Sequence, residues 1–191
     1  MEVIKTGGRG ATSSKGAGAK SLSSTEQNAI FEYTTSRYQQ INGNLRDGKK
    51  LSKSDQKIIE SLDSAANKST IPKGTELYRG TTAEALGINK DIQKMTANDV
   101  KQLVGQTIQD KAFLSTSTNK ESAKNFAGRG SKVNGNVNLV ITTKSNAKGI
   151  DVKNNSNFGG KEQEVILPRN AKLKITGAKR KLGNLTVYAE Y

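Results

Sequence analysis

Helix signals come first in this 191-residue sequence and strand signals follow, and this order limits the folds open to the chain. Ser23-Ser24-Thr25-Glu26 has the pattern of a capping box, and apolar residues recur after it at three- and four-residue steps as far as Leu45. A second helix is predicted from Ser52, and Pro72-Lys73-Gly74 predicts the turn that follows it. Helices followed by strands predict an α+β fold, with N-terminal helices packed on a mainly antiparallel two-sheet β core.

The second part of the sequence is rich in predicted strands. We expect them at residues 76–80, 107–108, 112–116, 137–142, 162–167, 172–176 and 185–191. Two short helices are predicted between them, one capped by Thr96 and running through Val104, the other opening at Thr118 and ending near Phe126. The stretches 131–138 and 144–149 are rich in Asn, Lys and Gly, which predicts surface loops.

The first twenty residues differ in composition from the rest. Residues 1–20 are rich in Gly, Ala, Ser and Lys without hydrophobic periodicity, which predicts a flexible basic tail ahead of one domain at 21–191. The tail lacks the apolar run of a signal peptide, and the sequence has no stretch of about 18 apolar residues. We therefore expect no membrane insertion, and we also expect a monomer.

The sequence contains neither Cys nor His, and this excludes whole classes of chemistry. Without Cys there are no disulfides and no thiolate metal sites. Without His there is no imidazole base, and Ser-His or Cys-His nucleophile arrangements are ruled out. Any catalysis must use carboxylates, Arg, Lys, hydroxyls or Tyr, and we expect no metal site.

The chain is strongly basic, with 31 Lys and Arg against 17 Asp and Glu. The net charge of +14 includes a cluster of cations between residues 169 and 181. Such charge favours phosphate-bearing or acidic partners, so an acidic or nucleic-acid-associated target would suit this chain. The same charge also suits a solvated face that keeps the protein soluble.

A pair of carboxylates, Glu162 and Glu164, enters the predicted strand at 162–167. Residues at i and i+2 of a strand lie on the same face, where like charges repel each other. A site that stabilises developing positive charge or moves a proton uses such a pair, although exposed Glu-x-Glu also occurs on solvent faces. The pair is therefore a candidate site that needs other residues to support it.

Two further segments carry polar side chains beside predicted strands. Leu77-Tyr78-Arg79-Gly80 places an arginine near the end of one strand, and Ser115-Thr116-Ser117 ends another. Each alone is a weak signal, because an arginine at a strand end often makes a surface ion pair and a run of hydroxyls often caps a helix. All three segments in this order indicate one site.

With these three segments, the sequence resembles the Arg-Ser-Glu class of mono-ADP-ribosyltransferases, which includes binary toxins, clostridial exoenzymes and phage enzymes. The resemblance assigns catalytic positions to Arg79, Ser115, Glu162 and Glu164, and it implies a single ADP-ribosyltransferase catalytic domain at 21–191. NAD would be the substrate that donates ADP-ribose. Secretion or delivery into a host cell, with action in the host cytoplasm, is the localisation that the resemblance implies.

The resemblance also implies a set of residues that bind NAD. On the first helix, Tyr33, Tyr38, Asn42 and Arg46 have the spacing of residues that line the NAD site in relatives, and Phe126-Ala127-Gly128-Arg129 supplies an aromatic residue and an arginine. Tyr33 and Tyr38 also suit half-buried core positions, and Phe126 also suits a core anchor. The full expected set is Tyr33, Tyr38, Asn42, Arg46, Arg79, Gly80, Ser115, Thr116, Ser117, Phe126, Arg129 and Glu164.

The chemistry of NAD explains why these residue types are needed. Its pyrophosphate suits a fork of arginine donors, and cleavage of the nicotinamide–ribose bond leaves an oxocarbenium-like ribose. The resemblance gives the stabilisation of that charge to Glu164 and its positioning to Ser115. Relatives with Glu rather than Gln at the position of Glu162 modify arginine, because a carboxylate can accept the guanidinium proton.

The resemblance therefore predicts transfer of ADP-ribose to an arginine side chain of a target protein, with Phe158, Gly159, Lys161 and Glu162 in contact with that target. Two alternatives stay open. The same pocket could hydrolyse NAD with water as the acceptor. The basic charge could instead make this a nucleic-acid-binding or virion-associated protein without catalysis, although only nine Phe and Tyr, and no Trp, are present for stacking.

Overall fold

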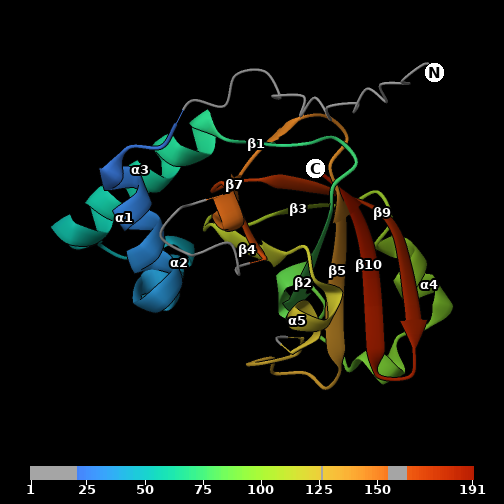
Figure 1. The fold of residues 1–191 in the computed structure, drawn as a ribbon. Coiled ribbons are helices and arrows are strands. Elements are labelled where there is room, and N and C mark those ends of the chain that lie inside the picture. Colours follow the sequence, from blue (N-terminus) through green and yellow to red (C-terminus); the bar gives the residue numbers. More distant parts are fainter. Residues whose placement is uncertain (1–20, 126, 155–162) are drawn as a thin grey trace, which may run out of the picture.

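The computed structural model describes residues 21–125, 127–154 and 163–191, and its N-terminal helices form a lobe beside a large sheet (Figure 1). The lobe contains α1 (Ser24–Glu32), the π-helical segment η1 (Tyr33–Arg37), α2 (Tyr38–Asp47) and α3 (Lys53–Lys68). Ser23 and Glu26 form the predicted capping box of α1, and Gly48 ends α2 with a φ of 66°. The predicted first helix is thus confirmed, with a π-helical turn inside it that the sequence did not predict.

The main sheet has eight strands among the described residues, in the order β3-β9-β10-β5-β2-β4-β8-β7. The strands are β2 (Glu76–Thr81), β3 (Thr107–Gln109), β4 (Leu114–Ser117), β5 (Asn136–Thr142), β7 (Ile150–Asp151), β8 (Glu164–Leu167), β9 (Lys172–Lys181) and β10 (Asn184–Glu190). Neighbours pair antiparallel except β10 and β5, which are parallel.

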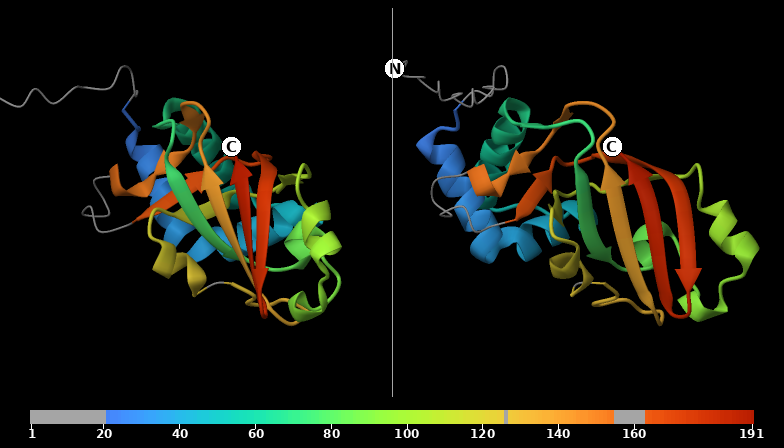
Figure 2. Two further views of the ribbon diagram at one scale, coloured as in Figure 1. Left: turned by 90° about the vertical axis from the view of Figure 1, so that its right-hand side faces the viewer. Right: turned by 45° about the vertical axis from the view of Figure 1, so that its right-hand side comes forward.

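One residue pair, Tyr78 and Ser117, joins β2 to β4. The sheet therefore behaves as two halves that meet at β2 and β4, and this agrees with the predicted α+β fold with a mainly antiparallel core. Figure 2 shows α1, α2 and α3 beside the half that contains β4, β7 and β8, with α4 (Ala97–Gln102) at the far end of the other half.

Shorter elements complete the fold. They are α5 (Lys120–Lys124), η2 (Glu84–Leu86), η3 (Ile92–Lys94), η4 (Val152–Asn154), and the two-stranded sheet of β1 (Thr70–Ile71) with β6 (Ala147–Lys148). The predicted loops at 131–138 and 144–149 were partly wrong, because β5 begins at Asn136 and β6 lies at 147–148. Both strands are held by pairing with distant segments, which polar local composition does not reveal.

Strand β9 runs to Lys181, five residues beyond the predicted end at 176. Residues 178–181 pair with β10 across a turn in which Leu182 has a φ of 51°. The predicted end stopped short because this part of β9 is mostly exposed and basic, so it lacks the apolar alternation of a half-buried strand.

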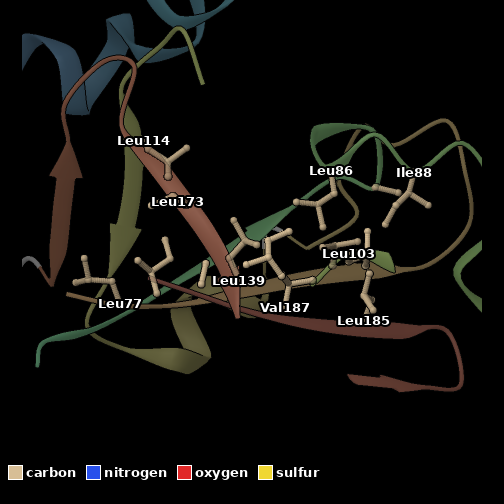
Figure 3. Close-up of a cluster of buried hydrophobic side chains, with 14 of the residues drawn as sticks. Leu77, Leu86, Ile88, Leu103, Leu114, Leu139, Leu173, Leu185 and Val187 are labelled. Carbon is tan, nitrogen blue, oxygen red and sulfur yellow. The ribbon is translucent and has the colours of Figure 1, made fainter. Parts of the chain in front are cut away.

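Two apolar clusters lie on opposite faces of β4 and β8. The larger packs the long half of the sheet against the η2, η3 and α4 region, and Figure 3 shows it with Leu139 and Val187 near its centre. The smaller joins the helical lobe to Phe113, Ile150 and Ile166. Each fully buried aliphatic side chain contributes about 1.5–3 kcal/mol, so both clusters hold β4 and β8 firmly in place.

Candidate functional site

A cavity of about 1330 Å³ opens where the two halves of the sheet meet. Residues of α2, β2, β4 and α5 line it, together with the linker between β3 and β4 and the first residue of β8. Ligand pockets commonly measure roughly 300–1,000 Å³, so this cavity has room for a dinucleotide.

Arg79 lies on β2 and reaches into the cavity wall formed by β4. Its Nη1 donates a 2.7 Å hydrogen bond to the carbonyl oxygen of Ser115. Burial lowers the pKa of Arg79, and the nearby charge of Arg46 lowers it further, while Asp110 acts in the opposite direction. A guanidinium stays protonated at neutral pH, so Arg79 presents a partly buried positive charge to the cavity.

The three hydroxyls of β4 have different surroundings. Thr116 is buried and donates to the carbonyl of Val165 at 2.7 Å, and Ser117 accepts from the backbone N–H of Asn119 at 2.9 Å. Ser115, on the same face as Ser117, lies beside the buried Tyr33 hydroxyl. Thr116 and Ser117 thus hold β4 to its neighbours, and Ser115 faces the site.

Glu164 is the first residue of β8, directly opposite Ser117 of β4. Its side chain is half-buried and lines the cavity. The pKa of Tyr33 is raised, first by burial and also by the negative charge of Glu164, so this carboxylate lies close to the helical lobe as well as to β4. The structure therefore brings Arg79, Ser115 and Glu164 to one wall of the cavity.

The residues predicted on the first helix divide into two groups. Tyr38, Asn42 and Arg46 line the cavity. Tyr33 does not; it is fully buried in edge contact with Phe113, with ring centroids 5.6 Å apart. Its hydroxyl accepts a 2.8 Å hydrogen bond from Nδ2 of Asn42, which places Tyr33 behind the cavity wall as a support.

Asn42 has one polar atom for which the described residues supply no partner. Its Oδ1 is buried and accepts no hydrogen bond from the described residues. A buried acceptor without a donor is costly, by about 1–3 kcal/mol. Because Asn42 lines the cavity, a ligand with hydroxyl or amide donors would fit this position.

Gly80 and Arg129 also line the cavity, and their expected role in NAD binding stays a prediction. The loop that carries Arg129 is tied to β2 by a 2.9 Å bond from the N–H of Gly128 to the carbonyl of Thr81. Glu84 holds the other side of this loop, since its carboxylate accepts from Ser131 Oγ at 2.9 Å and from the N–H of Lys132. The sequence did not single out Glu84, because no motif contains it.

Asp110 is a second cavity residue that the sequence did not single out. It makes a two-pronged ion pair with Arg46, whose Nε and Nη2 lie 3.0 Å and 2.7 Å from the carboxylate oxygens. The only signal in the sequence would have been its place a few residues before the strand that carries Ser115.

Five predicted site residues lie outside the described residues. They are Phe126, Phe158, Gly159, Lys161 and Glu162. The expected roles of Phe126 in NAD binding and of the other four in target contact therefore stay predictions.

In the described part of the chain, no group of three or more acidic side chains is placed to hold a metal ion. No helix among the residues the structure describes has the length and apolar character needed to cross a membrane.

Comparison with known proteins identifies the class to which this fold and cavity belong. A family model described as ADP-ribosyltransferase exoenzyme matches residues 11–187. The chain therefore belongs to the ADP-ribosyltransferase exoenzyme family, and the predicted resemblance is confirmed.

Individual relatives agree with this assignment. Exoenzyme T of Pseudomonas aeruginosa is 29% identical over 154 residues, which cover 80% of this chain and 29% of that protein. The chain thus spans less than a third of the length of the curated relatives it matches.

Solved structures share the fold. An ADP-ribosyltransferase of Clostridium botulinum superposes with a TM-score of 0.70 at 22% identity, covering 88% of this chain and 87% of that one. An ADP-ribosylating toxin of C. perfringens, the enzyme of a binary enterotoxin solved with NADH, gives a TM-score of 0.69 at 24% identity, covering 90% of this chain and 44% of that one. At these identities the structures support the fold alone.

Proposed function

We propose that this chain is a mono-ADP-ribosyltransferase that transfers ADP-ribose from NAD to an arginine side chain of a target protein. The observation that carries the proposal is the convergence of Arg79, Ser115 and Glu164 on one wall of a dinucleotide-sized cavity. Family membership supports the transfer of ADP-ribose from NAD. The choice of arginine rests on the carboxylate of Glu162 in the sequence.

The cavity residues suit NAD in three ways. Arg46, Arg79 and Arg129 offer guanidinium groups for the pyrophosphate. Asn42 offers an unpaired acceptor for a ribose hydroxyl or the nicotinamide amide. Glu164 offers a carboxylate for the ribose that gains positive charge. Together these groups bind the substrate and orient its reacting ribose.

The reaction proceeds by substitution at the ribose carbon that bears nicotinamide. The carbon–nitrogen bond breaks, and its electron pair leaves with nicotinamide. Glu164 stabilises the oxocarbenium-like ribose that results. A guanidine nitrogen of the target then bonds to this carbon, and Glu162 accepts the proton that the guanidinium loses.

The test compares the chain with its Glu164→Gln variant, using labelled NAD and a host-cell lysate. We expect the wild type to label a protein and Glu164→Gln to slow labelling by at least about 100-fold, while NAD binding is retained. Glu60→Gln is a matched control, because Glu60 is an exposed glutamate on α3. Equal labelling by wild type and Glu164→Gln, or none by either, would rule out the proposal.

A second variant separates transfer of ADP-ribose to arginine from hydrolysis of NAD. Glu162→Gln should leave NAD hydrolysis in place and abolish transfer to a guanidino compound such as agmatine, because the proton acceptor is lost. If both activities fall equally, Glu162 does not have the proposed role.

We also propose that the chain acts inside a host cell after delivery, since its relatives are exoenzymes and toxins.

A further inference from the structure

Asp110 is held rigidly at the rim of the cavity. It lies in the linker between β3 and β4, where its carboxylate accepts from the backbone N–H of Ala112 at 2.9 Å. Its own carbonyl oxygen accepts from the N–H of Asn170, also at 2.9 Å. These two backbone bonds fix the position of the carboxylate before any ligand binds.

The ion pair with Asp110 uses only one edge of the Arg46 guanidinium. Nε and Nη2 face the carboxylate. Arg46 has five N–H donors in a planar fork, so those of Nη1 and the second N–H of Nη2 are left for another acceptor. Arg46 lines the cavity, and its side chain is 43% exposed. Among the described residues, no group accepts from Nη1.

Arg46 and Arg79 both line this cavity, so it contains two guanidinium groups. Burial is the main cause that lowers the pKa of Arg79, the positive charge of Arg46 lowers it further, and the charge of Asp110 acts in the opposite direction. Lys111 and Arg129 add further positive charge to the lining, and Glu84 and Glu164 add negative charge. A ligand with two adjacent negative charges would relieve the repulsion between Arg46 and Arg79.

We propose that Asp110 is a positioning residue for NAD binding, which holds the Nε edge of Arg46 so that its Nη edge meets the pyrophosphate together with Arg79. The inference rests on the proposed function, because it takes NAD as the ligand. Asp110 does not touch the substrate in this arrangement; it acts through Arg46. Its role is to set affinity for NAD rather than the rate of bond cleavage.

The test is the Asp110→Asn variant, which keeps an acceptor for the N–H of Ala112 but loses the charge pair. We expect the KM for NAD to rise about tenfold with kcat nearly unchanged. In an Arg46→Ala background, the same change should have almost no further effect on KM, because its partner is absent. A merely structural role would not produce this dependence on Arg46.

A second Asp–Arg pair provides the matched control. Asp63 and Arg169 are also joined by two hydrogen bonds, but neither lines the cavity. Asp63→Asn should lower the melting temperature without changing the KM for NAD. If Asp110→Asn does not fold, Arg46→Gln gives the second measurement. Because the Arg46 side chain is exposed, this substitution should raise the KM for NAD at little cost in stability.

Three results would overturn the inference. They are an unchanged or lower KM in Asp110→Asn, the same rise in KM with and without Arg46, and an unchanged KM in Arg46→Gln. A failure of the proposed function is seen separately, because the wild type would then show no NAD turnover or binding at all.

Discussion

At the scale of single residues, the site depends on side chains that support others. Tyr33 fixes Asn42, Glu84 holds the loop of Arg129, and Asp110 holds Arg46. In each case a buried or clamped group orients a cavity residue that would otherwise lose conformational entropy on binding. We therefore expect substitutions of the supporting residues to change affinity for the ligand, although these residues need not contact it.

Gly128 offers a test of this support. Its φ is 74°, and an added Cβ would lie 2.7 Å from the carbonyl oxygen of Gly135. Gly128→Ala should lower the free energy of unfolding by about 2–3 kcal/mol, through both φ strain and this contact, and raise the KM for NAD because Arg129 is displaced. Chemical denaturation and NAD kinetics measure the two effects.

Gly130 is the matched control for that prediction. It has a similar φ of 76°, but an added Cβ would have no atom within 4 Å. Gly130→Ala should therefore cost only about 1 kcal/mol, the cost of the φ strain alone. Equal losses of stability in the two variants would contradict the steric argument at Gly128.

At the scale of elements, strand β4 shows how one short segment serves both the core and the site. Leu114 and Thr116 point to one face, where Leu114 enters the larger apolar cluster. Ser115 and Ser117 point to the other face. The N-terminal helical segment also serves both, because η1 begins at Tyr33, which faces the core, and is followed by Tyr38, which faces the cavity.

Helix α1 carries a carboxylate whose ionisation stabilises the fold. Burial raises the pKa of Glu26, but bonds from Lys68, Ser64 and the N–H of Ser23 outweigh burial and hold the pKa at about 2, against an ordinary value of 4.5. Since the folded pKa is the lower one, this stability is present above pH 4.5 and is lost as the pH falls toward 2.

Glu26→Gln should therefore lower the free energy of unfolding by about 1–2 kcal/mol at pH 7. The difference from wild type should shrink steadily as the pH is lowered through the acid range. Denaturation curves at several pH values measure it, with the exposed Glu60→Gln as a control that should show no such trend. A constant difference across this range would show that the charge of Glu26 is not what stabilises α1.

At the scale of the whole molecule, two apolar clusters share the strands that carry the site. Val165 and Leu167 of β8 enter the larger cluster, and Ile166 between them enters the smaller one. The helical lobe and the long half of the sheet are thus joined through β8. We expect them to unfold together, in one transition.

Ile166→Ala tests this coupling. Ile166 is fully buried opposite Ser115, so the substitution should lower the free energy of unfolding by about 2–5 kcal/mol. Circular dichroism and tyrosine fluorescence should report the same midpoint, because Tyr33 lies in the smaller cluster and Tyr191 packs on the larger one. Separate midpoints would show that the lobes unfold independently.

Val104→Ala is the control. Because Val104 is exposed, this substitution should change the free energy of unfolding by less than about 0.5 kcal/mol.

Much of the fold could be predicted because its signals are local. The caps at Ser23, Ser52 and Thr96 form the hydrogen bonds that their spacing predicts. The short strands β1, β6 and β7 could not be predicted, since two residues show no period and pair only with distant partners. For Tyr33 the sequence left a core position and an NAD-binding position open, and only its packing against the distant Phe113 places it behind the cavity wall.

The sequence by itself determined the chemistry open to this protein. The absence of Cys and His restricted it to carboxylates, Arg, Lys, hydroxyls and Tyr, and the order of Arg79, Ser115 and Glu164 selected the candidates among these, because such properties belong to residue type and spacing. Only the tertiary structure decided which groups act together. The pairing of Arg46 with Asp110, and of Glu84 with the Arg129 loop, joins residues far apart in the chain, and such contacts depend on how sheet and helices pack.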